Sequence, residues 1–164
     1  MKRLSLIRHA KSDPGYPGLE DIDRPLNSRG YTDARAMAER VMSSGIRPGF
    51  IMSSTAVRAA STALIFARVL GVPEKNMLFT PRLYEVNPDK FINAVRTLPD
   101  SADHAFVFGH NNTITEVVNS LCRQNIPNIP TGGFVMMESD ISSWKELDKC
   151  IALLFDYPKN ISDR

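Results

Sequence analysis

The stretch Leu4–Ser12, which reads Leu-Ser-Leu-Ile-Arg-His-Ala-Lys-Ser, decides the fold. It begins as a short apolar run, typical of a buried strand, and ends abruptly in Arg8 and His9. In open α/β sheets, ligand sites lie outside the carboxyl ends of the strands. An arginine and a histidine at such an end therefore predict chemistry at that edge of the sheet. Taken alone, the stretch is also compatible with a surface histidine after an edge strand, so the rest of the chain has to decide.

The composition is that of an ordinary globular protein. The chain has 164 residues, of which 43% are hydrophobic and 23% charged, and its mean hydropathy is -0.19. These values predict one domain spanning residues 1–164, large enough for a core without disulfides or metals. A net charge of +2, with no run of Lys or Arg and no aromatic platform among basic residues, argues against a nucleic-acid partner.

No stretch reaches the apolar length of a membrane span, so no membrane partner is expected. Arg8 and His9 interrupt the N-terminal apolar run too early for an export signal, which favours a cytoplasmic location. The two cysteines, Cys122 and Cys150, are isolated and lack the spacing of metal ligands. We expect two buried thiols with no metal or redox role.

Strand and helix patterns alternate along the chain, and further strands follow at the end. This order predicts an α/β three-layer sandwich, in which a mostly parallel central sheet has helices on both faces. The Met and Phe stripes are expected in the core, and the polar tail 157–164 is expected to fray. The predicted strands are 4–7, 50–52, 77–79, 104–108, 134–137 and 150–155. The first predicted helix is capped by Ser28 or Asn27, has the apolar face Ala34, Met37, Ala38, Val41 and Met42, and is ended by Gly45 and Pro48. The other predicted helices run over 54–70 and 87–98 and follow Asn112, and a turn or short helix is predicted at 142–146.

Charged and histidine side chains recur where the predicted strands end. Arg58 lies in the first turn of the helix after the second strand, and His110 lies at a later strand-to-helix turn. Glu85 lies in a fourth connection. The N-terminus of a helix offers free N–H groups and the positive end of its dipole, which suit an anion. Two arginines and two histidines at one pole predict a site for a dianion.

This set of residue types fits phosphoryl transfer. The planar fork of arginine matches phosphate oxygens, and a neutral imidazole can attack phosphorus to form a covalent phosphohistidine. No Asp/Glu cluster or Cys/His metal spacing is evident in the sequence, so the arginines would supply the positive charge that Mg²⁺ supplies in other enzymes. We therefore expect phosphoryl transfer with no cofactor and no metal ligands.

The motifs resemble those of the histidine phosphatase superfamily, also called phosphoglycerate mutase-like. They occur in the family's order over residues 3 to 112, and the final third fits only as trailing strands. The compact length and the form Arg-His-Ala-Lys-Ser look most like the SixA branch, the phosphohistidine phosphatases. The matching segments are Arg8–Ser12 (the Arg-His-Gly signature), Arg24–Gly30, Ser53–Ala63 (the second signature), Leu83–Glu85 (the segment bearing the acid) and Gly109–Asn111 (the last signature).

The resemblance implies a role for each position. His9 would be the phosphorylated nucleophile, Arg8 and Arg58 would bind the phosphoryl oxygens, and His110 would donate a further hydrogen bond to them. Glu85 would be the candidate general acid and then the base that activates water, for which its pKa would have to be raised.

Other charged and polar residues are assigned to the edge of the site. Ser12 would either offer its hydroxyl or N–H to the phosphate or only shape the loop. Lys11 and Arg24 are expected at the rim, where Arg24 would brace the site through an ion pair with Asp21 or Asp23.

The sequence departs from the family pattern at three positions. Ala10 replaces the usual glycine, and Asn112 stands where SixA-like sequences often have proline. Gly15 occupies a place where phosphoglycerate mutases carry a substrate-binding asparagine, which argues against mutase activity. The short segment between Arg58 and His110 leaves little room for the insertion that roofs the site in sugar phosphatases. We expect an open, shallow site suited to a phosphorylated side chain on a protein.

Three functions are compatible with these residues. The leading hypothesis is a protein phosphohistidine phosphatase whose partner is a phosphorylated protein. The second is a phosphatase for small phosphate esters, which would need Glu85 as its acid. The third is a phosphate-binding module that has lost efficient turnover. The oligomeric state does not follow from the sequence.

Overall fold

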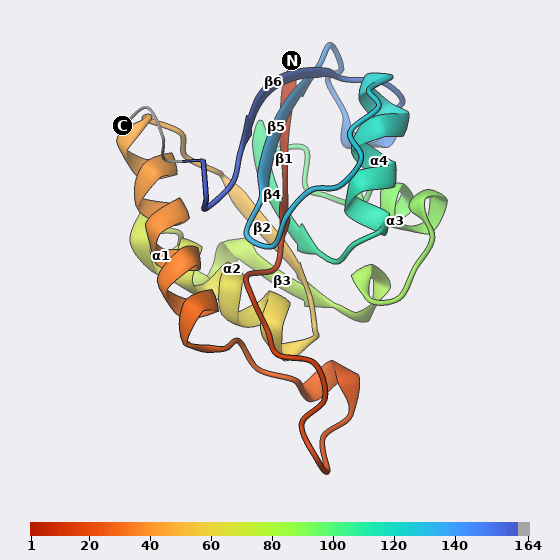
Figure 1. The fold of residues 1–164 in the computed structure, drawn as a ribbon. Helices are drawn as coiled ribbons and strands as arrows, with labels where there is room; N and C mark the ends of the chain where they lie inside the picture. Colours follow the sequence, from red (N-terminus) through yellow and green to blue (C-terminus); the bar gives the residue numbers. More distant parts are fainter. Residues whose placement is uncertain (161–164) are drawn as a thin grey trace.

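In the computed structural model of the chain, which describes residues 1–160, a twisted six-stranded sheet lies between two layers of helices (Figure 1). The strand order is β3-β2-β4-β1-β5-β6. The pairs β1–β4, β4–β2 and β2–β3 are parallel, whereas β1–β5 and β5–β6 are antiparallel. The predicted three-layer α/β sandwich with a mostly parallel sheet is confirmed. The strands are β1 Lys2–Arg8, β2 Phe50–Ser54, β3 Met77–Thr80, β4 His104–Gly109, β5 Phe134–Ser139 and β6 Ile151–Asp156.

Two pairs of helices cover the two faces of the sheet (Figure 1). The helices are α1 Ser28–Ser43, α2 Val57–Leu70, α3 Pro88–Val95 and α4 Thr113–Cys122, and the 3-10 turns are η1 Asp21–Asp23, η2 Glu74–Asn76, η3 Pro81–Leu83 and η4 Trp144–Glu146. Asn27 caps α1 by accepting a hydrogen bond from the Gly30 N–H at 2.8 Å, and Gly71 ends α2 in the left-handed conformation. None of the helices within residues 1–160 is long and apolar enough to cross a membrane.

The inner strand β1 contributes to the core on both of its faces. Leu4 and Leu6 pack in the cluster that includes α3 and α4, and Ile7 packs in the cluster that includes α1 and α2. Successive side chains of a strand point to opposite faces of the sheet, so Leu4 and Leu6 share a face and Ile7 lies on the other. Burial on both sides anchors β1 and thereby fixes the position of its carboxyl end.

The structure differs from the sequence predictions for some residues of the expected core and for part of the C-terminal tail. Met42, Phe79 and Phe155 are partly exposed, because Met42 lies at the edge of the buried face of α1, and β3 and β6 are the outer strands of the sheet. Along β6, Ile151 is 72% exposed. The expectation that the tail frays is wrong for residues 157–160, since Arg40 donates hydrogen bonds to the carbonyls of Tyr157 and Pro158. Residues 161–164 lie outside the described part of the chain.

The loop between β1 and α1 packs closely against the start of α1. The Asn27 N–H donates to the Lys11 carbonyl at 3.0 Å, and a Cβ atom added at Gly30 would lie 2.1 Å from the same carbonyl oxygen. Glycine is therefore required at position 30 for close approach of two backbone segments. This contact sets the path of the loop that carries Ser12, η1 and Arg24.

Gly30→Ala tests this packing. In an exposed helix interior, replacing Gly by Ala raises the free energy of unfolding by about 1 kcal/mol. At position 30 we expect the opposite effect. We expect the free energy of unfolding, measured by urea denaturation, to fall by about 1–3 kcal/mol, because the backbone of the loop has to move. Thr32→Ala, an exposed change in the same helical turn, should stay within about 0.5 kcal/mol of the wild type. A gain in stability for Gly30→Ala would show that the loop accommodates the methyl group.

Candidate active site

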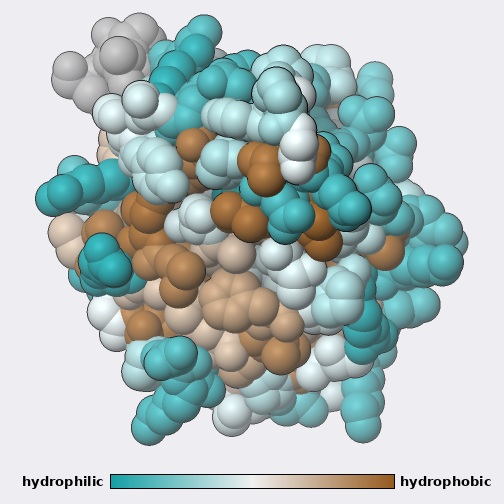
Figure 2. Space-filling model, turned by 90° about the horizontal axis from the view of Figure 1, so that it is seen from below, coloured by the Kyte–Doolittle hydropathy of each residue, from teal (hydrophilic) through white to brown (hydrophobic). Residues whose placement is uncertain are grey.

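Three adjacent parallel strands bring the predicted residues to one edge of the sheet, the lower end in Figure 1. Arg8 is the last residue of β1 and His9 follows it, while His110 follows Gly109 at the end of β4. In the register between these strands Arg8 faces Gly109, so the two histidines emerge side by side with ring centroids 5.3 Å apart. Arg58, in the first turn of α2, follows β2. Figure 2 views this end of the molecule, where a broad apolar patch is bordered by hydrophilic residues.

His9 is buried, and one of its ring nitrogens is committed to the backbone. Its Nδ1 lies 2.7 Å from the carbonyl oxygen of Ala10. A carbonyl can only accept, so Nδ1 carries the hydrogen and Nε2 carries the lone pair. The Ala10 N–H donates to Thr62 Oγ1 at 3.1 Å, and the Thr62 hydroxyl donates to the Arg58 carbonyl at 2.7 Å. The backbone around His9 is thus joined to the turn that carries Arg58.

The tautomer of His110 follows from the bonds of Ser54. Ser54 is fully buried, and its Oγ lies 2.8 Å from His110 Nε2. The same oxygen accepts a hydrogen bond from the Ala56 N–H at 3.2 Å. Since a buried hydroxyl also has to donate, its hydrogen goes to His110 Nε2. The hydrogen of the neutral His110 ring is therefore on Nδ1.

The two arginines are held by their terminal nitrogens. Arg8 Nη1 donates to the Ile129 carbonyl at 2.9 Å. Arg58 donates twice to Asp21, from Nη1 to the backbone oxygen at 2.6 Å and from Nη2 to Oδ2 at 2.9 Å. Within residues 1–160, the buried side-chain nitrogens and oxygens without a hydrogen-bond partner are Arg8 Nε, Arg58 Nε and His110 Nδ1. All three are donors, and a buried unpaired donor costs about 1–3 kcal/mol, so the arrangement suits an oxyanion beside His9.

Ser12 and Glu85 lie at the edge of this cluster. The Ser12 hydroxyl donates to the Pro25 carbonyl at 2.7 Å and accepts from Arg24 Nη1 at 3.1 Å, contacts that shape the loop. Glu85 is exposed and has a positive φ of 50°; it lies directly after Tyr84, whose ring packs edge-on against His110 at 5.4 Å. The structure therefore gathers Arg8, His9, Arg58 and His110 and leaves Ser12 and Glu85 at the rim, where their predicted roles remain predictions.

Sequence reasoning missed the central position of one rim residue. Asp21 is bonded to Arg58, to Arg24 through a 3.0 Å ion pair, and to the Tyr84 hydroxyl at 2.6 Å. The predicted brace between Arg24 and Asp21 is confirmed. The contacts of Asp21 with Arg58 and Tyr84 join segments far apart in the sequence, and no spacing rule could have indicated them. Ser54 and Tyr84 lie inside matched motifs, although no role was assigned to them.

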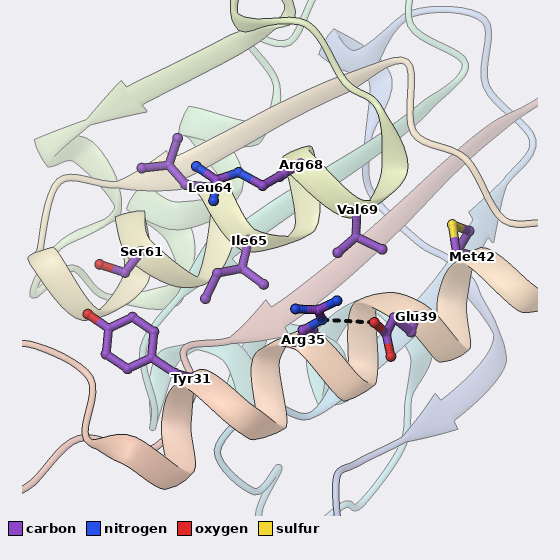
Figure 3. Close-up of a pocket in the computed structure, with 9 residues that line it drawn as sticks. All are labelled: Tyr31, Arg35, Glu39, Met42, Ser61, Leu64, Ile65, Arg68 and Val69. Atoms are coloured by element: carbon purple, nitrogen blue, oxygen red, sulfur yellow. Dashed lines mark hydrogen bonds and ion pairs between the residues drawn. The ribbon is translucent and has the colours of Figure 1, made fainter.

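A groove of about 630 Å³ lies beside this cluster rather than at it. It runs between α1 and α2 and is lined mainly by apolar side chains such as Leu64, Ile65 and Val69, with Arg35 and Glu39 paired on its border (Figure 3). None of the predicted site residues lines it. Within residues 1–160, no group of three or more His, Cys, Asp or Glu side chains is arranged to hold a metal ion.

Comparison with known proteins identifies the family. Residues 4–94 match the family model of the histidine phosphatase superfamily, branch 1. An uncharacterised chloroplastic protein of Arabidopsis thaliana is 30% identical over 154 residues, which cover 88% of this chain and 70% of that protein. The chain belongs to the histidine phosphatase superfamily. The family predicted from the sequence motifs is confirmed.

Solved structures of this superfamily share the fold. The putative phosphohistidine phosphatase SixA from Agrobacterium tumefaciens superposes with a TM-score of 0.82 at 23% identity, covering 96% of this chain and 98% of that chain. A protein histidine phosphatase SixA complexed with tungstate superposes with a TM-score of 0.78 at 18% identity, covering 95% and 97%. At these identities the likeness establishes the SixA-like fold and leaves the substrate open.

Desolvation keeps His9 and His110 neutral at physiological pH. Desolvation lowers the pKa of His9 to about 3; the hydrogen bond to the Ala10 carbonyl opposes this shift, and electrostatic repulsion from His110, Arg58 and Arg8 adds to it. Desolvation and Arg58 likewise lower the pKa of His110 to about 4, an effect that the Asp21 carboxylate opposes. At neutral pH the Nε2 lone pair of His9 is therefore available as a nucleophile.

These shifts predict an acid-sensitive fold. Desolvation also lowers the pKa of His104, at the opposite end of β4, to about 4. In the unfolded chain these three histidines take up protons near pH 6.5, whereas in the folded chain they do so only near pH 3–4. The free energy of unfolding is therefore at its full value above pH 6.5 and falls as the pH decreases below it. The slope is up to about 1.4 kcal/mol per pH unit for each histidine.

We expect urea denaturation to give a lower free energy of unfolding at pH 5 than at pH 7.5. His104→Gln should weaken this dependence, and equal stability at both pH values would contradict the assignment.

Proposed function

We propose that this protein is a metal-independent phosphatase that hydrolyses phosphohistidine on a partner protein through a covalent phosphoryl intermediate on His9. The observation that carries the proposal is the set of three buried, unpaired donors, on Arg8, Arg58 and His110, beside a histidine whose Nε2 is free. Membership of the histidine phosphatase superfamily supports phosphatase activity.

In the first step the Nε2 lone pair of His9 attacks phosphorus and forms an N–P bond. The P–N bond of the substrate breaks, and its electron pair returns to the substrate imidazole. Arg8 Nε, Arg58 Nε and His110 Nδ1–H would stabilise the charge on the phosphoryl oxygens. The Ala10 carbonyl stabilises the positive charge that develops on the His9 ring, because it already accepts the Nδ1 hydrogen.

In the second step water attacks phosphorus and the P–Nε2 bond breaks. The electron pair returns to His9, and both hydrogens of the water leave with the phosphate as H₂PO₄⁻. No separate base is needed to balance this step. Because one imidazole replaces another in the first step, the leaving group matches the nucleophile, and a phosphohistidine substrate makes little demand on an acid. The SixA structures that share the fold are named a putative phosphohistidine phosphatase and a protein histidine phosphatase, which supports the same substrate class.

Replacing His9 by Ala is the direct test. The protein is mixed with a phosphohistidine-bearing peptide in EDTA, quenched rapidly and analysed by intact mass. We expect one phosphoryl group on the wild type and none on His9→Ala, because the Nε2 lone pair of His9 is available for attack, whereas His110 Nε2 is bonded to Ser54 and its Nδ1 carries a hydrogen. His104→Asn is the matched control, since His104 is a half-buried histidine at the far end of β4, bonded to Ser5; this variant should still be phosphorylated.

An adduct on His9→Ala would contradict the assignment of the nucleophile. Binding of the phosphopeptide by the wild type with neither adduct nor released phosphate would favour the phosphate-binding module. Loss of activity in EDTA that added metal restores would contradict the metal-independent mechanism.

A phosphatase for small phosphate esters is the second candidate, and the position of Glu85 favours it. Glu85 is exposed at the rim and lies beside Tyr84. Burial, the bond to Asp21 and the nearness of Glu85 together raise the pKa of Tyr84 to about 12. A carboxyl group near the exit of the leaving group could protonate an alkoxide.

Glu85→Gln separates these two functions. If esters are the substrates, kcat for a small phosphate ester should fall about 10²–10⁴-fold, the usual contribution of a general acid. If phosphohistidine is the substrate, its cleavage should change by less than about threefold, because imidazole leaves without an acid. Steady-state kinetics on both substrates with one enzyme preparation provides the measurement. A steep loss on phosphohistidine would show that Glu85 acts in that reaction too.

A further inference from the structure

Asp21 is the most highly connected charged residue on the rim of the site. It lies in η1, within the loop that follows His9. Its Oδ2 accepts from Arg58 Nη2 at 2.9 Å and from the Tyr84 hydroxyl at 2.6 Å, and its Oδ1 accepts from Arg24 Nε at 3.0 Å. One carboxylate thus joins a predicted phosphate-binding arginine, a second arginine and an aromatic ring that packs on His110.

The Asp21 carboxylate retains capacity for another donor. A carboxylate has about four acceptor positions, and the bonds above use three. The remaining position is on Oδ1, which accepts from Arg24 alone. The side chain is 48% exposed, so a group arriving from solvent can reach it.

In-line attack by His9 places the leaving group on the side of the site where Asp21 lies. The attacking and leaving atoms lie roughly in line through phosphorus. His9 is 8% exposed and attacks from the protein interior, so the leaving group departs on the solvent side. On that side lie Asp21 and Tyr84, with the Tyr84 ring 5.4 Å from that of His110 and His110 5.3 Å from His9.

We propose that Asp21 determines specificity by accepting a hydrogen bond from the distal ring N–H of a phosphorylated imidazole, so that the site selects leaving groups that bring their own proton. This inference rests on the proposed function. When such an imidazolium leaves, the electron pair of the breaking P–N bond neutralises its positive charge, and its N–H hydrogen stays in place. The carboxylate stabilises the cationic ring before transfer, and no proton moves between enzyme and substrate.

The surroundings of Asp21 suit this role and oppose the role of an acid. The bonds from Tyr84, Arg58 and Arg24 hold the pKa of Asp21 far below its usual range, so the carboxylate is ionised at neutral pH. An ionised carboxylate cannot protonate an alkoxide, and it repels the negative charge that develops on one. The charged or titratable groups around it are Arg24, Arg58, Tyr84 and His110, with Glu85 beside Tyr84.

The test compares Asp21→Asn with the wild type on two substrates, a peptide phosphorylated on histidine and p-nitrophenyl phosphate. We expect the ratio of kcat/KM for the peptide to that for the ester to fall at least tenfold in the variant. The loss on the peptide should be largest near pH 6 and should shrink toward pH 9, because a deprotonated substrate ring has no N–H to donate. Asp23→Asn is the matched control: it makes the same charge change in the same turn, and within residues 1–160 Asp23 forms no side-chain hydrogen bond with Arg58, Arg24 or Tyr84.

Three outcomes would overturn the inference, and they can be told apart. If Asp21→Asn lowers kcat/KM for both substrates by the same factor at every pH, or changes neither, Asp21 only positions Arg58 or does not contact the leaving group. If the wild type cleaves neither substrate, the proposed function itself is wrong and the inference fails with it. A selective, pH-dependent loss on the phosphohistidine peptide, absent from Asp23→Asn, would establish the role of Asp21.

Discussion

The pairing of β1 with β4 is the constraint on which the site depends. The two strands are parallel, and their register places Arg8 opposite Gly109, so His9 and His110 follow at the same level of the sheet edge. Packing of β1 against helices on both faces prevents this register from slipping, because a shift by one residue would turn Leu4, Leu6 and Ile7 to the wrong sides. The chemistry at the edge therefore has the rigidity of the core beneath it.

That rigidity allows the protein to keep an arrangement that is unfavourable for folding. Arg8 and Arg58 lie close to His9 and His110, and each arginine has an unpaired buried Nε. The neighbouring positive charges and burial act in the same direction on His9, since both disfavour its protonated form. The arginines that leave buried donors unpaired thus also help to keep His9 neutral. A neutral imidazole is the form that can attack phosphorus.

The sequence was sufficient for the parts of the protein that follow local rules. Apolar runs ending in Arg8 and His110, and a helix starting just before Arg58, predicted both the sandwich and the edge where these residues meet. Rules of this kind could not place Asp21, because its contact with Arg58 depends on the path of the loop over Gly30, a close approach of two backbone segments. They also failed for Met42 and Phe155, since hydrophobicity alone does not show which residues lie at the margin of a helix face or on an outer strand.

The residues that could be predicted lie at strand ends and at the start of α2, whereas those that could not lie in connections, and the two groups have different proposed functions. The residues proposed to hold and attack the phosphoryl group are fixed by strand ends and by the first turn of α2, and hence by the fold itself. The groups on the leaving-group side, Asp21, Tyr84 and Glu85, lie in η1 and in the connection after β3. Connections tolerate change more readily than the core does, so the leaving group can be altered without disturbing phosphoryl transfer. The same fold can therefore serve different phosphorylated substrates, and the choice between a P–N and a P–O bond in this protein would be made by these rim residues rather than by His9.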